Sequence, residues 1–151
     1  MSGRRVTTWY LEMRSPAQLR RARVPDPAPR FERVELCSPA FARYLYSHVG
    51  GDWHWSDRLP WSYAQWQQWL DRPQVQTWVL YERGTPAGYG QLEAQERGDV
   101  ELSYFGLARE FIGRGLGGHL LTLTIEKAWA MEARRVWVPT CSLDHPQALA
   151  N

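Results

Sequence analysis

The sequence is poor in cysteine, has no long apolar run and carries little net charge, and each of these shortages excludes a class of protein. Its 151 residues include two cysteines, Cys37 and Cys141, whose spacing fits no metal-ligand or redox motif. No apolar run reaches the length of a membrane span, and the N-terminal residues lack the pattern of a secretory signal. We therefore expect a cytoplasmic protein with free thiols and no membrane partner.

The basic residues are not gathered into a patch. The net charge is +2, and the 18 lysines and arginines are spread along the chain apart from Arg20, Arg21 and Arg23. A nucleic-acid-binding surface needs a basic stripe or cluster, so no nucleic-acid partner is expected.

Glycine, in contrast, is concentrated in one stretch. Four of the 12 glycines are Gly113, Gly115, Gly117 and Gly118, which follow a strand pattern and precede a helical one. Glycines at the start of a helix let backbone N–H groups approach an anion, and the helix dipole favours negative charge there. The stretch therefore predicts a binding site for a phosphate or pyrophosphate.

Two known kinds of phosphate loop fit these glycines poorly. A P-loop has Lys and then Ser or Thr after its last glycine, but His119 follows Gly118 here. The dinucleotide-binding fingerprint belongs in a first βαβ unit with an acidic residue ending the next strand, whereas the next strand pattern runs into Pro139. An NTPase is disfavoured, and an NAD-binding protein is a distant alternative.

The stretch resembles the signature of the GNAT superfamily of N-acetyltransferases, Arg/Gln-x-x-Gly-x-Gly/Ala. The matching residues are Ile112-Gly113-Arg114-Gly115-Leu116-Gly117, with Ile112 in place of the usual Arg or Gln. The general-base glutamate of the family lies fourteen residues before the first glycine of the signature, and Glu101 lies fourteen before Gly115. The resemblance covers residues 31–151 and implies that the chain moves an acetyl group from acetyl-CoA to a primary amine of a small molecule or peptide.

The resemblance also implies roles for individual residues. Glu101 would be the general base that removes a proton from the protonated amine, directly or through water, with Glu93 on the neighbouring strand in reserve. Without the resemblance, Glu101 is also compatible with an ordinary solvated glutamate on a strand. The Phe105 amide would donate to the oxyanion, and the Leu107 backbone would pair with pantetheine. Residues 112–118 would hold the cofactor phosphates.

Three further candidates lie elsewhere in the chain. In GNAT proteins the loop between the first two helices lines the acceptor side, so Trp53 and Trp55 are candidate substrate contacts, or else they fill the core. Many members carry Asn-x-x-Ala-x-x-x-Tyr, and alignment on Ala148 places His145 at the asparagine and the tyrosine just after Asn151. His145 is therefore a candidate cofactor contact or a helix cap.

The order of the predicted elements gives the fold class. Strand patterns occur at residues 7–13, 31–37, 75–81, 88–94, 100–105 and 136–138. Helical patterns occur at 17–23, 39–50, 63–71 and 119–133, and the first three follow the candidate N-caps Ser15, Ser38 and Ser62. Short connections within the 75–105 segment require antiparallel strands, and the long helix predicts one parallel crossover. We expect one α+β domain over residues 1–151, a three-layer sandwich with a mixed, mostly antiparallel sheet flanked by helices. Residues 1–30 would be an N-terminal extension.

The family comparison also implies a C-terminally shortened chain. The helical pattern that opens at Pro146 has about one turn before Asn151, and the last two strands of the GNAT fold would be missing. We expect an exposed edge on the strand at 136–139, and with it a tendency to form a homodimer. Because the expected tyrosine is missing, the alternative to an enzyme is a non-catalytic acyl-CoA-binding module.

Overall fold

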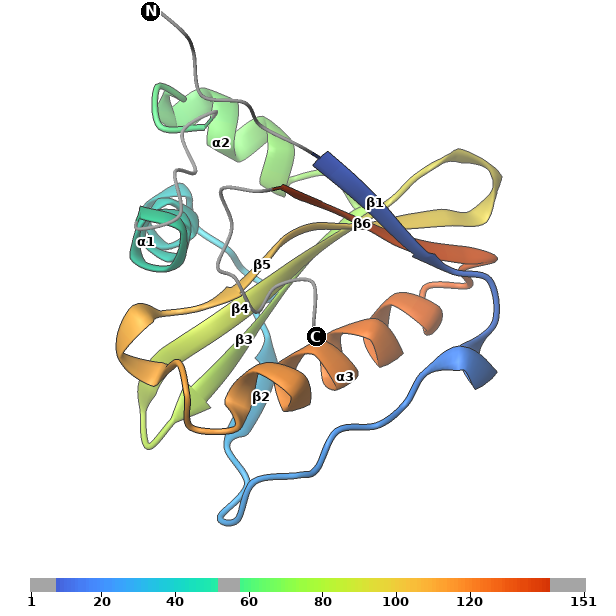
Figure 1. Cartoon of the computed structure of the whole chain (residues 1–151). Coiled ribbons are helices and arrows are strands. Elements are labelled where there is room, and N and C mark those ends of the chain that lie inside the picture. The colour runs from blue at the N-terminus through green and yellow to red at the C-terminus, as the bar shows by residue number, and fades with distance from the viewer. Residues whose placement is uncertain (1–7, 52–57, 142–151) are drawn as a thin grey trace, which may run out of the picture.

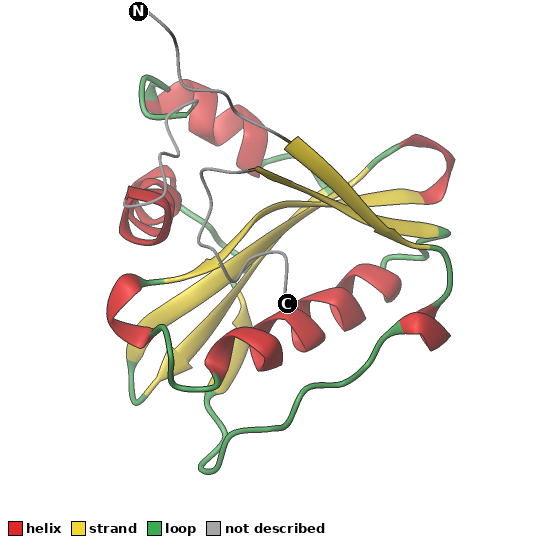
Figure 2. Cartoon of the chain, in the orientation of Figure 1, coloured by secondary structure: helices red, strands yellow, loops and turns green. Residues whose placement is uncertain are grey.

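The computed structural model describes residues 8–51 and 58–141, which form one six-stranded sheet with helices on both faces (Figures 1 and 2). The strands are β1 (Thr8–Met13), β2 (Arg30–Arg33), β3 (Val75–Glu82), β4 (Thr85–Ala94), β5 (Asp99–Leu107) and β6 (Arg135–Cys141). The helices are α1 (Pro39–Gly50), α2 (Tyr63–Leu70) and α3 (Leu116–Trp129). The expected α+β fold class is confirmed. No described helix is long and apolar enough to cross a membrane.

The sheet has the order β1-β6-β5-β4-β3-β2. Its neighbouring strands are antiparallel except β5 and β6, which run parallel and are joined through α3. The antiparallel meander and the single crossover predicted from the sequence are both present. In Figure 1, α3 lies on one face of the sheet, and α1 and α2 lie on the other.

Serine residues begin two of the helices, as the sequence predicts. Ser38 Oγ accepts from the Phe41 amide at 3.1 Å, and Ser62 Oγ accepts from the Gln65 amide at 3.2 Å. Each bond satisfies one of the N–H groups that the first turn of a helix leaves unpaired. The starts of α1 and α2 are therefore set by local sequence.

Small residues on β4 let α3 pack closely against the sheet. Leu116 and Leu120 of α3 lie in a buried cluster with Leu80 of β3 and Ala87 of β4. Further along the helix, a Cβ atom on Gly90 would lie 2.6 Å from Cγ2 of Thr124, so only glycine fits this contact. The packing fixes where the first turn of α3 lies relative to β5.

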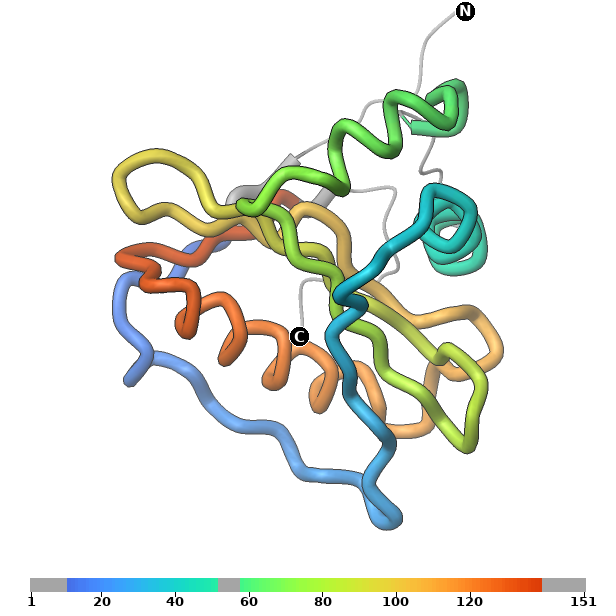
Figure 3. Tube along the Cα trace, turned by 180° about the vertical axis from the view of Figure 1, so that it is seen from behind, coloured from blue at the N-terminus to red at the C-terminus, as the bar shows by residue number. Residues whose placement is uncertain are grey.

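The segment expected to form a helix at 17–23 is mostly extended, and that prediction is wrong. A single 3-10 turn, η1 (Pro16–Gln18), is closed by a capping box with Ser15. Beyond it the chain runs along α3, where the Ala22 amide donates to Thr122 Oγ1 at 3.0 Å (Figure 3). This contact with α3 takes the place of the hydrogen bonds of a further helical turn.

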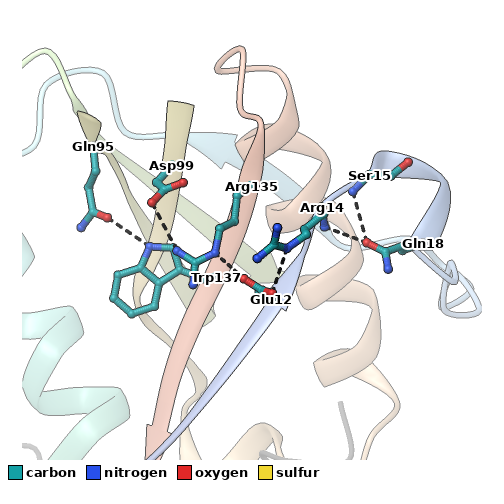
Figure 4. Close-up of polar contacts among 8 residues, drawn as sticks. All are labelled: Glu12, Arg14, Ser15, Gln18, Gln95, Asp99, Arg135 and Trp137. Atoms are coloured by element: carbon teal, nitrogen blue, oxygen red, sulfur yellow. Dashed lines mark hydrogen bonds and ion pairs between the residues drawn. The ribbon is translucent and has the colours of Figure 1, made fainter. Parts of the chain in front are cut away.

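The expectation of an exposed edge on β6 is also wrong. β1 pairs antiparallel with β6 from Thr8↔Cys141 to Met13↔Val136. Arg135 of β6 forms ion pairs with Glu12 of β1 and with Asp99 of β5, which link three strands (Figure 4). The N-terminal segment therefore covers the edge, and the reason for expecting a homodimer no longer holds. The helix expected from Pro146 lies outside the described residues.

We predict that Gly90→Ala destabilises the protein by about 1–3 kcal/mol, because the added methyl group overpacks a buried contact with Thr124. Gly51→Ala is the matched control, since Gly51 has a helical φ of −58° and, within the part of the chain that the structure describes, no atom lies within 4 Å of its Cβ position. Urea unfolding of both variants measures the effect. An unfolding midpoint for Gly90→Ala equal to that of the parent would contradict this account of α3 packing.

Candidate active site

The parallel strands β5 and β6 part after a short ladder. They pair only over Asp99–Glu101 with Arg135–Trp137, although β5 continues to Leu107 and β6 to Cys141. Ser103 is an extra residue on β5, because Gln91 of β4 pairs with Tyr104 and the next residue, Leu92, pairs with Leu102. A bulge of this kind bends a strand. The strands β5 and β6, whose places are seen in Figure 1, therefore form a fork. Its apex is the Glu101↔Trp137 pair.

One backbone edge of β5 faces this fork. The Ala108 amide donates to the Ala87 carbonyl of the β4 side at 2.7 Å. In an antiparallel ladder, successive residues direct their backbone groups alternately toward and away from the partner strand. This alternation directs the N–H and C=O groups of Phe105 and Leu107 away from β4. Both groups are therefore placed to hydrogen-bond a molecule lying in the fork.

The glycine turn lies beyond the end of β5 and forms the start of α3. Gly113 and Gly115 have φ angles of +86° and +77°, and no atom of the described residues lies within 4 Å of the position that a Cβ would take on either. Gly115 is the N-cap of α3, and it makes no side-chain cap bond, in contrast to Ser38 and Ser62. The space and the first-turn N–H groups suit an anionic group such as a pyrophosphate.

The other residues of the turn contribute in different ways. The Leu116 side chain is 1% exposed and belongs to the core, which leaves only its backbone for a ligand. The Arg114 guanidinium lies 5.3 Å from the ring centroid of Phe111. A Cβ on Gly118 would lie 3.0 Å from Cβ of Ala22, so the N-terminal segment contacts this part of the turn. Two residues complete the turn: Ile112, which ends the 3-10 turn η4 (Arg109–Phe111), and Gly117, in the first turn of α3.

Two carboxylates lie together at the fork. Glu101 on β5 is the cross-strand partner of Glu93 on β4. Nε2 of Gln95 donates to Oε1 of Glu101 at 2.9 Å and to Oε1 of Glu93 at 3.1 Å. Arg72, just after α2, binds Oε2 of Glu93 through Nη1 at 2.6 Å. The fold thus brings together both glutamates that the sequence indicated.

Burial raises the pKa of the Glu101 carboxyl above its ordinary value, and the negative charge of Glu93 raises it further. The hydrogen bond from Gln95 and the positive charge of Arg58 act in the opposite direction. A carboxylate with a raised pKa is a stronger base, provided that it remains ionised at the working pH.

An aromatic cluster with a buried arginine covers the face of the sheet on which Glu93 and Glu101 lie. Arg58 is 8% exposed, and its Nη1 donates to Oε1 of Gln91 at 3.0 Å. Its guanidinium carbon lies 4.6 Å from the ring centroid of Trp61, 4.1 Å from that of Trp69 and 4.3 Å from that of Tyr104. These contacts are cation–π interactions in a desolvated setting.

Sequence reasoning missed three residues of this site: Arg58, Gln95 and Trp137. Gln95 lies in a turn with no motif, and the opposition of Trp137 to Glu101 depends on a parallel register that no local pattern reveals. Two candidate substrate contacts, Trp53 and Trp55, and one candidate cofactor contact, His145, lie outside the described residues.

The sequence matches a family model of acetyltransferases, and the fold is similar to those of solved acetyltransferases. Residues 40–150 match the model described as the Acetyltransferase (GNAT) family. No curated protein matches the sequence. A similar fold occurs in a GCN5-related N-acetyltransferase from Kribbella flavida, with a TM-score of 0.61 and 16% identity over 89% of this chain and 50% of that one. A second, from Sphaerobacter thermophilus, has a TM-score of 0.63 and 15% identity over 93% and 44% of the two chains.

An aminoglycoside acetyltransferase from an uncultured soil metagenomic sample, solved in complex with sisomicin, also has this fold. Its TM-score is 0.66, with 14% identity over 83% of this chain and 84% of that one. The present chain spans about half the length of the two GCN5-related proteins. At these identities the solved structures establish the fold alone.

We predict that Glu93→Gln lowers the pKa of Glu101. Removal of a neighbouring negative charge makes ionisation of Glu101 easier, and it also releases the Arg72 guanidinium from its carboxylate partner. The measurement is an NMR titration of the Glu101 side-chain carboxyl carbon, assigned with Glu101→Gln. Glu82→Gln, on β3, is the control and should leave that pKa unchanged. An unchanged or raised pKa in Glu93→Gln would show that the two carboxylates do not interact.

Proposed function

The chain belongs to the GNAT acetyltransferase family, and on that premise we propose that it transfers the acetyl group of acetyl-CoA to a primary amine. The observation that carries the proposal is the place of Glu101, at the apex of the fork between β5 and β6 and on the face covered by α2. A base at this point lies beside the backbone edge that suits the cofactor. The acceptor would be a small-molecule amine or a peptide amine.

The residues of the fork and the glycine turn fit acetyl-CoA. The Phe105 and Leu107 backbone groups would hold the pantetheine arm, and residues 112–118 would hold the pyrophosphate through their backbone N–H groups. The exposed, positive-φ glycines Gly113 and Gly115 support this assignment, because the space beside them is open. When bound, acetyl-CoA supplies the acetyl group as a reactive thioester.

Glu101 would act as the general base. An amine with a pKa of about 10 is protonated at neutral pH, and it must lose a proton before its nitrogen can attack. The half-buried Glu101 carboxylate would accept that proton, directly or through one water molecule. Glu93 would share the site as a second acceptor, and the Phe105 N–H would donate to the acetyl oxygen during attack.

The acceptor side would be formed by the face that carries the aromatic cluster. Trp61, Trp69 and Tyr104 present rings on this face, and Glu93 and Glu101 present negative charge. The two carboxylates suit a cationic amine, whereas the three rings already contact the Arg58 guanidinium. One protein of the same fold is named as an aminoglycoside acetyltransferase, so an aminoglycoside belongs among the amines tested.

The proposal is tested by thiol release from acetyl-CoA with a panel of amines: an aminoglycoside, a polyamine, an amino acid and a peptide with a free N-terminus. With the best acceptor, Glu101→Gln should lower kcat/KM about 10²-fold at pH 7. The loss should shrink at high pH, because the amine is then already neutral. Acetyl-CoA affinity, measured by calorimetry, should stay the same.

Glu32→Gln is the matched control, since it makes the same change on β2 at the far edge of the sheet. An equal loss at every pH, or none, would remove Glu101 from the role of base. Tight acetyl-CoA binding without thiol release for any amine would instead identify a non-catalytic acyl-CoA-binding module.

A further inference from the structure

Gln95 joins the two carboxylates of the site to β6. The side chain of Gln95 lies just after β4 and makes three hydrogen bonds. Its Nε2 donates to Glu101 and Glu93, and its Oε1 accepts from Nε1 of Trp137 at 3.0 Å. Trp137 is the β6 residue paired with Glu101 at the apex of the fork. One amide side chain therefore contacts three residues on three strands.

The indole of Trp137 determines which end of the amide faces the carboxylates. An indole N–H can only donate, so it requires the oxygen of the Gln95 amide. The amide NH₂ group then faces Glu101 and Glu93, which can only accept when they are ionised. In the opposite orientation the amide oxygen would face two carboxylate oxygens, and the indole N–H would face another donor. The three bonds are thus mutually dependent.

The indole is itself held in place by charged residues (Figure 4). The Arg135 guanidinium lies 5.5 Å from the Trp137 ring centroid. Arg135 is bound by Asp99 of β5 at 3.2 Å and by Glu12 of β1. Glu12 is also the cross-strand partner of Trp137. The N-terminal strand, which precedes residues 40–150 that match the family model, therefore supports the apex of the fork.

We propose that Gln95 is a positioning residue for Glu101, and that Trp137 fixes the orientation of the Gln95 amide. The inference rests on the proposed function in one respect, which is that Glu101 is taken to be the general base. Gln95 holds the Glu101 carboxylate at the point where β5 and β6 part, and its N–H favours the ionised form. It restrains the base without contacting the acceptor.

Among the described residues, the charged groups near Glu101 act on its pKa in opposite directions. Glu93 on β4 opposes ionisation, whereas Arg58, which precedes α2, favours it. Arg72, after α2, pairs with Glu93, and Asp99 and Arg135 pair with each other. Burial and the charge of Glu93 raise the pKa of Glu101, and the Gln95 hydrogen bond lowers it. Loss of that hydrogen bond removes one of the influences that lower the pKa. The pKa of Glu101 should then rise, opposite to the effect of Glu93→Gln.

The test is an NMR titration of the Glu101 carboxyl carbon in the full chain, its Gln95→Met variant and its Trp137→Phe variant. Gln95→Met keeps the length of the side chain without its hydrogen bonds, and Trp137→Phe removes the indole donor. Both should raise the pKa of Glu101. Trp78→Phe is the matched control, because Trp78 Nε1 makes the same kind of bond to Gln76 Oε1 at 3.0 Å on β3. It should leave that pKa unchanged.

The parent protein provides a measurement that needs no variant. The Gln95 side-chain NH₂ resonances should titrate with the same midpoint as the Glu101 carboxyl, because the amide donates to it. Resonances that do not respond, or an unchanged Glu101 pKa in Gln95→Met, would overturn the positioning role. A response in Gln95→Met but not in Trp137→Phe would overturn the role of Trp137.

The pH dependence of kcat/KM separates this inference from the proposed function. In both variants, the acid limb of the profile should move to higher pH together with the Glu101 pKa. A raised Glu101 pKa with an unmoved acid limb would support the role of Gln95 and reject Glu101 as the base. A moved limb with an unchanged Glu101 pKa would reject the role of Gln95.

Discussion

The parting of β5 and β6 is the constraint on which the candidate site depends. The ladder stops at the Glu101↔Trp137 pair, and beyond it no strand among residues 8–51 and 58–141 pairs with the facing edges of β5 and β6. A full parallel ladder would use the backbone groups of Phe105 and Leu107 within the sheet, and it would leave no place for an extended ligand. The bulge at Ser103 bends β5 near the point where this separation begins. The fork therefore combines an open backbone edge with a half-buried carboxylate.

Two other parts of the chain keep the fork in shape. The close approach of α3 to β4, permitted by Gly90, places the uncapped first turn of α3 beyond the end of β5. On the other side, β1 pairs with β6 along its length, so that β6 is supported after it leaves β5. The ion pairs of Arg135 with Glu12 and Asp99 tie these strands together near the apex.

The features that depend on local chemistry could be predicted from the sequence. Serine caps, short turns and the glycine cluster act over a few residues, and they indicate the starts of α1 and α2, the antiparallel meander and the place of the glycine turn before α3. The pairing of β1 with β6 depends on contacts between segments more than a hundred residues apart, and no local pattern indicates it. The segment at 17–23 has the composition of a helix, but its contacts with α3 override helix propensity. Gln95 and Trp137 could not be found for the same reason, since their bond spans two elements.

The proposed function requires an acyl-CoA ligand to occupy the fork along the edge of β5 that is directed away from β4. Amide hydrogen exchange resolved by NMR, with and without saturating acetyl-CoA, tests this residue by residue. A ligand in this position should slow the exchange of the Phe105 and Leu107 amides and of the amides in the first turn of α3. The amides of Tyr104 and Gly106, which are directed toward β4, should change little. Protection confined to other surfaces, or equal changes at alternate residues of β5, would contradict the claim.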